Sequence, residues 1–251
     1  MKRYFIEVAY NGAAYAGFQI QQNANTIQAE VEKALLIYFR TSVPLTGSSR
    51  TDAGVHALQN FFHFDASFQI DINLIPKAIY HLNAILPNDI VVKSIKQTNS
   101  NAHARFDALY RSYQYNIHLT KNPFKDQTSF YYPFKLDIAL LNQAAEVLKD
   151  YSDFQSFSKK NTQVFTYNCT LTKSVWATQL HDLVYNVQGN RFLRGMVRGL
   201  VGTMLKVGRG KYSLNEFKNI IESKSPTKTD FSTPSHGLFL KEVGYNDDIF
   251  L

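Results

Sequence analysis

The 251-residue sequence contains one cysteine, Cys169, and this scarcity limits the chemistry available to it. A single thiol cannot form an internal disulfide, which is typical of proteins from a reducing compartment. Cys169 lies in a strand-like run, and we interpret it as a buried thiol rather than a nucleophile. The histidines show no recognisable ligand spacing, so no metal site is expected.

Long apolar segments and nucleotide-binding motifs are also missing. No window reaches 18 consecutive apolar residues, so we expect no contact with a membrane. The basic start of the chain is interrupted by Glu7 before any apolar stretch develops, which argues against a targeting segment and predicts a cytoplasmic protein. Neither Gly-x-Gly-x-x-Gly nor a Walker-type Gly-Lys-Ser/Thr occurs, so no nucleotide cofactor is indicated.

Acidic residues are fewer than basic ones. The chain has 27 Lys and Arg against 20 Asp and Glu, which gives a formal net charge of +7. Between Arg191 and Lys211 there are six cations and no acid. Such a run is usually a solvated face, but the overall balance favours a polyanionic partner, with phosphates docking along this segment.

Hydrophobic residues make up 45% of the chain, which is ample for a core. Their spacing predicts helices from about 26, over 74–82, 138–148, 192–207 and 214–222, and strands over 4–10, 60–64, 90–95, 109–119, 164–176, 183–187 and 238–243. This order favours an α+β fold with a mixed, mostly antiparallel sheet and helices on one face. Because the pattern recurs on either side of residue 105, we predict two similar α/β halves, 1–105 and 106–251, that share one continuous sheet and act as one unit.

Small residues crowd the segment 45–56, which predicts a loop between ordered elements. The loop sets Arg50 and Asp52 two positions apart, where glycines let a ligand approach the backbone closely. One interpretation is a carboxylate positioned for chemistry. The alternative is a surface turn in which Asp52 satisfies nearby N–H groups.

The predicted helix 192–207 is apolar over most of its girth and carries two further lines of residues. Its glycines lie at i, i+4 and i+7, and each costs the helix about 1 kcal/mol relative to Ala, which suggests close approach by another backbone. These glycines are Gly195, Gly199 and Gly202. Arg198 lies on an arginine line of this helix, so it either needs a carboxylate partner or extends to water.

The strand predicted after residue 109 places three large side chains on one side. Arg111, Tyr113 and Tyr115 alternate along it. Such a row could stack on a nucleic-acid base, or it could pair across strands within a sheet.

Five ordered motifs resemble those of a known family. They are Tyr10-Asn11-Gly12 with 15–19, the loop 47–56, His103-Ala104-Arg105-Phe106 with 111–115, Phe192 with 196–198 and Gly202, and 234–238. With this spacing the chain resembles the bacterial tRNA pseudouridine synthase I family, commonly called TruA, nearly end to end. It departs from the family pattern at positions that do not carry chemistry: Phe18, Ser48-Ser49, Gln59-Asn60 and Ser235.

The resemblance implies isomerisation of uridine to pseudouridine at positions 38, 39 and 40 of the tRNA anticodon stem-loop. It implies no cofactor, a homodimer with tRNA lying across both subunits, and an active-site cleft between the halves. By position, Asp52 is the nucleophile, Tyr113 stacks on the target base, Arg198 pairs with Asp52 and Arg50 enters the RNA helix where the base has left. Three further cations are candidates for contacts with the tRNA backbone: Arg191, Arg194 and Arg209.

Two other functions are compatible with parts of the sequence. A tRNA-binding protein without chemistry would explain the charge and Tyr113, but it would not explain a carboxylate beside anionic RNA. A glycosidase-like hydrolase would use Asp52 to release the base, but such enzymes usually need a second acid. Asp65 and Asp107 are possible candidates for that acid, but nothing in the sequence places them beside the loop.

Overall fold

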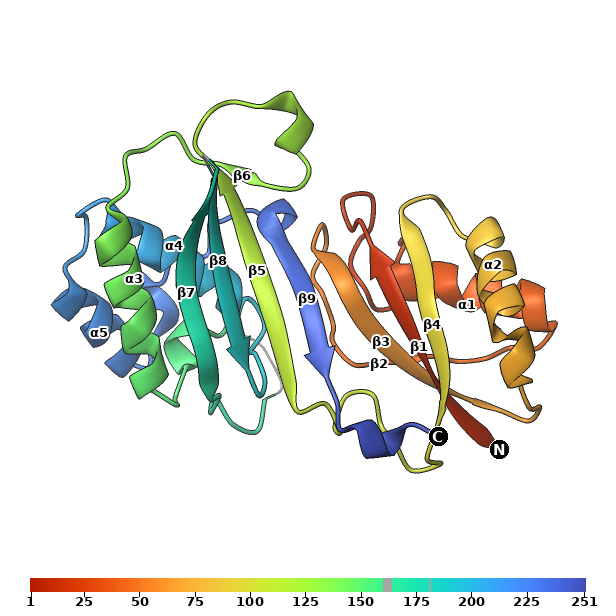
Figure 1. The fold of residues 1–251 in the computed structure, drawn as a ribbon. Helices are drawn as coiled ribbons and strands as arrows, with labels where there is room; N and C mark the ends of the chain where they lie inside the picture. Colours follow the sequence, from red (N-terminus) through yellow and green to blue (C-terminus); the bar gives the residue numbers. More distant parts are fainter. Residues whose placement is uncertain (160–163, 181) are drawn as a thin grey trace. The chain divides into compact units, whose positions relative to one another are not determined.

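A computed structural model describes residues 1–159, 164–180 and 182–251. They form two compact units (Figure 1). Unit 1 comprises residues 1–109 and 239–251, and unit 2 comprises residues 110–238. The end of the chain thus returns to the first unit, which a division of the sequence at residue 105 does not anticipate.

Unit 1 is built on strands in the order β4–β1–β3–β9, with the short strand β2 (Thr46–Gly47) paired to β3. The strand β1 (Lys2–Tyr10) lies between β3 (His56–Ala66) and β4 (Ile90–Thr98) and is antiparallel to both. The C-terminal strand β9 (Leu238–Gly244) joins β3 in parallel. The predicted catalytic loop therefore leads directly into a strand that is paired on both sides.

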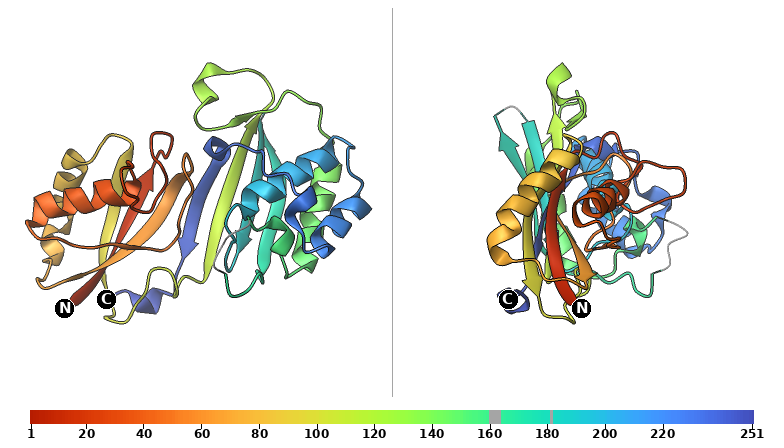
Figure 2. Two further views of the ribbon diagram at one scale, coloured as in Figure 1. Left: turned by 180° about the vertical axis from the view of Figure 1, so that it is seen from behind. Right: turned by 90° about the vertical axis from the view of Figure 1, so that its right-hand side faces the viewer.

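Two helices complete unit 1. The helix α1 (Ile27–Phe39) begins at Thr26, whose side chain accepts a hydrogen bond from the Ala29 N–H. It buries Val31 and Leu35, and seen from behind it lies across the strands of its unit (Figure 2). The helix α2 (Ile75–Ile85) contacts α1 and β4.

Unit 2 has a second set of strands, in the order β5–β8–β7. The strand β5 (Tyr110–His118) is antiparallel to β8 (Asp182–Gly189), which is antiparallel to β7 (Leu171–Gln179). The short strand β6 (Phe130–Tyr131) is parallel to β5. Three helices contact one another beside these strands: α3 (Ile138–Val147), α4 (Met196–Gly208) and α5 (Leu214–Glu222).

The helix that carries Arg198 begins four residues later than its periodicity predicts. The prediction started it at Phe192, whereas α4 starts at Met196. Gly195 has a φ of 76°, a left-handed backbone conformation that cannot continue a right-handed helix. The Met196 N–H instead closes a turn onto the Leu193 carbonyl at 3.0 Å. From Met196 onward almost every residue is buried, so α4 is the central helix of unit 2.

The strand predicted from residue 164 also begins late, at Leu171. Asn168 forms an isolated bridge with Asp153, and its N–H bonds to the Thr166 hydroxyl, so the chain turns locally before it enters the sheet. The α+β class and the mixed, mostly antiparallel strand pairing are confirmed. Continuity of the sheet between the halves and a cleft between them stay predictions. Over the described ranges, no helix is long and apolar enough to cross a membrane.

Candidate active site

A buried polar network holds the loop 45–56 on the side that precedes its carboxylate. The Thr51 hydroxyl is 2.9 Å from the Tyr10 hydroxyl. The Asn60 amide donates to the Tyr10 hydroxyl and to the Ser49 carbonyl, at 3.1 Å each. Asn60 is fully buried, and a buried amide without partners is costly, so these bonds fix one arrangement of the loop backbone.

Gly17 and Gly47 allow close packing between the loop and the segment that contains Phe18. Gly17 has a φ of 111°, and a Cβ there would lie 3.0 Å from the Thr51 carbonyl oxygen, which accepts a hydrogen bond from the Phe18 N–H at 3.1 Å. A Cβ on Gly47 would lie 2.2 Å from the Phe18 ring. That ring stacks on Phe62 with centroids 4.7 Å apart, so a Phe at position 18 packs directly against the loop.

His56 fixes the other end of the loop. It is 1% exposed, and its Nδ1 accepts a hydrogen bond from the Gly12 N–H at 3.1 Å. Its ring stacks on Phe239 with centroids 4.4 Å apart. Because Phe239 belongs to β9, the parallel pairing of β3 and β9 ties the loop to the C-terminal strand.

Asp52 lies at the turn between these two anchored ends. It is half-buried, whereas Arg50 is exposed. The Val55 N–H donates to the Asp52 carbonyl at 3.2 Å, and the Gly54 N–H donates to the Tyr15 carbonyl at 3.3 Å. The backbone beneath the carboxylate is therefore fixed by hydrogen bonds, and the cation beside it extends into solvent.

The two carboxylates considered as a second acid are occupied elsewhere in unit 1. Asp65 pairs with Arg3 at 2.7 Å, and this pairing holds the pKa of the Asp65 carboxyl below its usual range. Asp107 accepts a hydrogen bond from the His103 N–H at 2.7 Å. Asp65 also lies nine residues along β3 from His56, a distance of about 30 Å at the rise of an extended strand.

In unit 2 the predicted aromatic row separates into core and accessible members. Tyr115 is fully buried and donates to the Pro234 carbonyl at 2.7 Å, so it packs within the unit. Tyr113 is half-buried, and its ring meets the edge of Phe192 with centroids 5.0 Å apart and planes at 78°. Arg111 donates from Nη1 to the Asn190 carbonyl at 3.1 Å. Of the two tyrosines, only Tyr113 is accessible to solvent.

Arg198 is held on α4 by a reciprocal pair of hydrogen bonds. Its Nε donates to the Thr233 carbonyl at 2.7 Å, and the Thr233 hydroxyl donates to the Arg198 carbonyl at 2.8 Å. Among the described residues, Thr233 is the only hydrogen-bond partner of the Arg198 side chain. A carbonyl thus occupies Nε, where the sequence offers a carboxylate partner or water, and within the described ranges no hydrogen bond to the terminal Nη groups is found.

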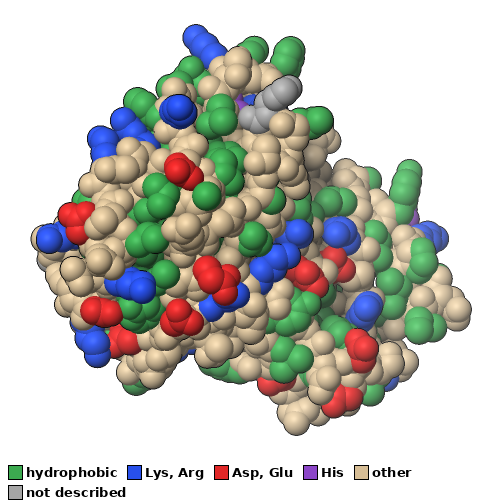
Figure 3. All heavy atoms as spheres, turned by 60° about the vertical axis from the view of Figure 1, so that its left-hand side comes forward, with side chains coloured by type: hydrophobic (Ala, Val, Ile, Leu, Met, Phe, Trp, Pro, Cys, Tyr) green, Lys and Arg blue, Asp and Glu red, His purple; other side chains and the backbone are tan. Residues whose placement is uncertain are grey.

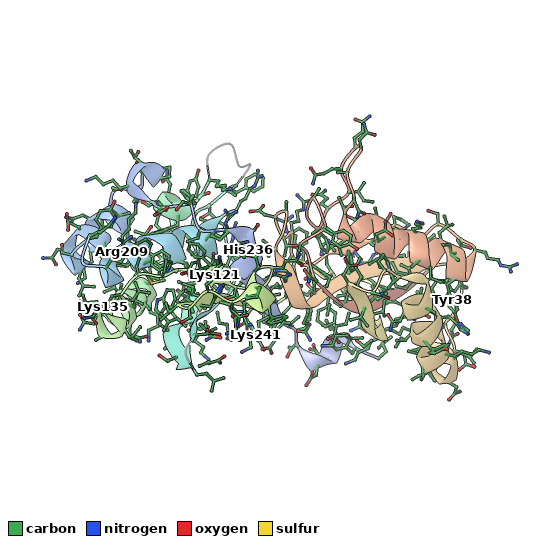
Figure 4. The ribbon with its side chains drawn as sticks, turned by 90° about the horizontal axis from the view of Figure 1, so that it is seen from above. Tyr38, Lys121, Lys135, Arg209, His236 and Lys241 are labelled. Atoms are coloured by element: carbon green, nitrogen blue, oxygen red, sulfur yellow. The ribbon has the colours of Figure 1, made fainter. Side chains whose placement is uncertain are left out.

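The other predicted cations lie around the ends of α4. Arg191 and Arg194 are in the segment between β8 and α4, and Arg209 follows the helix with its guanidinium 3.8 Å from the centre of the Phe134 ring. Arg209 and Lys135 lie at the same end of unit 2 (Figure 4). On the face around α3 and α5, basic and acidic side chains are interspersed (Figure 3). That face therefore presents no block of single charge.

The predicted site residues are divided between the two units. Asp52 and Arg50 share one loop of unit 1, and Tyr113 and Arg198 belong to unit 2. The pairing of Asp52 with Arg198 remains a proposal. No group of three His, Cys, Asp or Glu that could hold a metal ion occurs in the described part of the chain.

Sequence reasoning missed the residues that support the site. Asn60 had a usable signal, because an amide between apolar strand positions must find partners when it is buried. Thr233 had none, since its partner on α4 is 35 residues away in the sequence.

A family profile and individual relatives identify the same family for this chain. The sequence profile of a family described as tRNA pseudouridine synthase matches residues 144–246. The chain is 44% identical over 250 residues to tRNA pseudouridine synthase A of Parabacteroides distasonis, covering 100% of this chain and 98% of that protein. It is 42% identical to the protein of that name from Bacteroides fragilis, covering 100% and 99%, and 33% identical to the one from Staphylococcus aureus, covering 99% and 93%.

Proposed function

Because this chain belongs to the tRNA pseudouridine synthase A family, we propose that it isomerises uridine to pseudouridine at positions 38, 39 and 40 of the tRNA anticodon stem-loop. The bond from N1 of uracil to C1′ breaks and a bond from C5 to C1′ forms. C5 gives up a proton and N1 gains one, so the reaction balances without an oxidant, a reductant or a cofactor. The observation that carries this proposal is the anchored loop around Asp52.

Asp52 is the proposed nucleophile. A carboxylate attacks only in its ionised form, and it must hold one position while the base detaches and turns. Either C1′ of the ribose or C6 of the uracil is an electrophile that a single carboxylate can attack. The buried contacts on both sides of the turn support this role, because they fix the backbone from which the carboxylate projects.

Arg198 is proposed to pair with Asp52 during the reaction. A guanidinium beside a carboxylate favours the charged form and limits its rotation. The bond from Nε of Arg198 to the Thr233 carbonyl supports the role, because it leaves the two Nη groups as a planar fork that suits a carboxylate.

Tyr113 is proposed to stack on the target base. The edge contact from Phe192 supports the role, because it limits rotation of the tyrosine ring. The Tyr113 hydroxyl is also the best candidate acceptor for the C5 proton, since the motifs around the loop contain no better base.

The target uridine must leave its stem before any of these groups can reach it. Flipping a base costs a few kcal/mol, and contacts with phosphates can offset this cost. We propose that Arg50 enters the RNA helix in place of the base and that a homodimer holds the tRNA across both subunits. The cations proposed for phosphate contacts are Arg191, Arg194 and Arg209.

The test uses unmodified tRNA transcripts carrying 5-tritiated uridine. Three transcripts each keep one uridine among positions 38, 39 and 40, and a fourth has none. We expect tritium release from the first three and none from the fourth. Release that is independent of these positions would contradict the proposed target.

The same reactions separate the two other candidate functions. A binding protein would shift the tRNA in a gel without releasing tritium from any transcript. A hydrolase would release free uracil and leave abasic sites, and the pairing of Asp65 with Arg3 already counts against the second acid that it needs.

A further inference from the structure

The segment 229–233, here called the strap, lies along α4 in unit 2. The Asp230 N–H donates to the Thr203 hydroxyl at 3.1 Å, and Lys206 pairs with the Asp230 carboxylate at 3.3 Å. The Thr229 hydroxyl ties the strap to a third segment by donating to the Ser156 carbonyl at 2.6 Å. The strap is thus anchored to the helix by main-chain and side-chain contacts.

The glycines of α4 make room for this segment. A Cβ on Gly202 would lie 2.3 Å from the Asp230 carbonyl oxygen, and one on Gly199 would lie 2.9 Å from the Phe231 ring. Real Cβ atoms do not approach other heavy atoms so closely, so the strap can lie at this depth only where the helix has no side chain. The close backbone approach predicted from the glycine line is confirmed at Gly202, where the strap makes it, whereas Gly199 meets side chains of the strap and Gly195 meets the side chain of Lys159.

The strap ends at Thr233, which is 2% exposed and exchanges two hydrogen bonds with Arg198. We propose that Thr233 is a positioning residue, which fixes the Arg198 guanidinium so that its two Nη groups meet the Asp52 carboxylate end-on. This inference rests on the proposed function, in which Asp52 and Arg198 pair. It adds a residue that acts through Arg198 and touches neither the carboxylate nor the RNA.

The two hydrogen bonds between Thr233 and Arg198 have different roles. The Thr233 carbonyl occupies Nε, so the edge of the guanidinium that includes Nε is closed to a carboxylate and only the Nη1–Nη2 edge remains for two parallel bonds. The Thr233 hydroxyl holds that carbonyl in place by bonding to the backbone of the same arginine. The strap continues into Pro234, whose carbonyl accepts from Tyr115, and toward His236, labelled in Figure 4.

The variant Thr233→Val tests the proposal, because it keeps the shape of the side chain and removes the hydroxyl. We expect kcat for pseudouridine formation to fall about tenfold, because the Thr233 carbonyl that orients the guanidinium loses the hydrogen bond that holds it in place. KM for tRNA should change less than twofold. The matched control is Thr229→Val, which removes the other threonine hydroxyl of the strap. Thr229→Val should lower the melting temperature about as much as Thr233→Val does, and it should leave kcat near the wild-type value.

Two further variants separate positioning from stability. Thr233→Ser keeps the hydroxyl and should restore most of kcat. In an Arg198→Lys background, Thr233→Val should cause no further loss, because a residue that acts only through Arg198 has nothing left to position. The proposal is overturned if Thr229→Val lowers kcat as much as Thr233→Val, if Ser does not rescue, or if the two losses multiply.

A readout without catalysis tests the same contact. In a ¹⁵N–¹H spectrum of the whole protein, the Arg198 Nε–H should give a protected, slowly exchanging signal that is absent in Thr233→Val and kept in Thr229→Val. An unprotected signal in the wild-type protein would overturn the positioning role. If the signal behaves as expected but the protein releases no tritium from tRNA, the proposed function fails and the contact stands.

Discussion

At the scale of single residues, the site depends on side chains that hold other side chains. Asn60 and Thr51 are buried beneath the loop, and their hydrogen bonds fix the backbone that carries Asp52. Tyr113 is partly accessible to solvent and Tyr115 is not, although the two lie on the same side of β5. Accessibility, which alternation along a strand does not predict, therefore distinguishes the residue proposed to stack from the one that packs.

The Tyr113 hydroxyl gives a prediction at this scale. If it accepts the C5 proton, Tyr113→Phe should keep tRNA binding and lower the rate of tritium release by about 10²-fold or more, the usual contribution of a positioned base. The control is Tyr185→Phe, which removes a buried hydroxyl paired with Ser174 at 2.8 Å and should affect stability rather than rate. Full turnover by Tyr113→Phe would leave the ring with a stacking role alone.

At the scale of elements, α4 and the strap form one structure. The helix has glycine where the strap crosses it, and the strap carries the residue that bonds to Arg198. Gly202 lies at the closest point of this crossing, so the helix tolerates a residue of poor helix propensity there.

The variant Gly202→Ala tests the crossing. Alanine should favour the helix by about 1 kcal/mol, but its Cβ would meet a backbone carbonyl, and overpacking costs about 1–3 kcal/mol. We expect a net loss in the free energy of unfolding measured in denaturant. The comparison is Gly210→Ala. A Cβ added at Gly210 would have no heavy atom within 4 Å, and only the φ of 68° opposes the change. A Gly202→Ala protein more stable than the wild type would show that the strap is easily displaced.

Local signals determined how well each element was predicted. The helix α5 has the predicted bounds, and its start is defined by the capping box of Ser213 and Glu216. The predicted start of α4 was wrong. The apolar periodicity of the sequence continues through Gly195, but the left-handed backbone of Gly195 interrupts the helix. The position of β9 beside β3 could not be predicted, because the paired residues are about 180 positions apart in the sequence and no local pattern indicates such a pairing.

The strand β3 also carries a group whose ionisation affects stability. His63 is 7% exposed, and its Nδ1 accepts a hydrogen bond from the Ala104 N–H at 3.1 Å. Burial lowers the pKa of His63 to about 4; the charges of Arg3 and His103 act in the same direction, and those of Asp65 and Asp107 oppose it.

The pH dependence of unfolding follows from this shift. At pH values between about 4 and 6.5, the unfolded chain protonates His63 and the folded protein does not, so acid favours unfolding. The free energy of unfolding should therefore fall as the pH drops through this range, and the contribution of His63 should level off below pH 4. His63→Gln, which keeps an acceptor and cannot titrate, should show a smaller fall. An identical fall in both proteins would assign the effect to other groups.

At the scale of the whole molecule, a net charge of +7 supports binding to a polyanion. On the face around α3 and α5, basic side chains are mixed with acidic ones, which weaken its attraction for a polyanion (Figure 3). The cations near the ends of α4 are therefore the stronger candidates for contact with tRNA phosphates.

The salt dependence of tRNA binding tests this assignment. Replacing Arg191 or Arg194 by Gln should weaken binding and reduce the slope of log K against log salt by up to about 0.9 for each phosphate that the protein no longer neutralises. Lys218→Gln removes an exposed charge from α5 and should leave the slope unchanged. Equal slopes for all of these proteins would place the RNA-binding face elsewhere.

The most direct test of the account is a single-turnover measurement of pseudouridine formation with the wild-type protein and Asp52→Asn in excess over the same anticodon stem-loop. Asparagine keeps the shape of the side chain and removes its charge. We predict product with the wild type and with the control Asp65→Asn, and none with Asp52→Asn, while all three bind the RNA. Product from Asp52→Asn at the wild-type rate would contradict the central claim that this carboxylate carries the reaction.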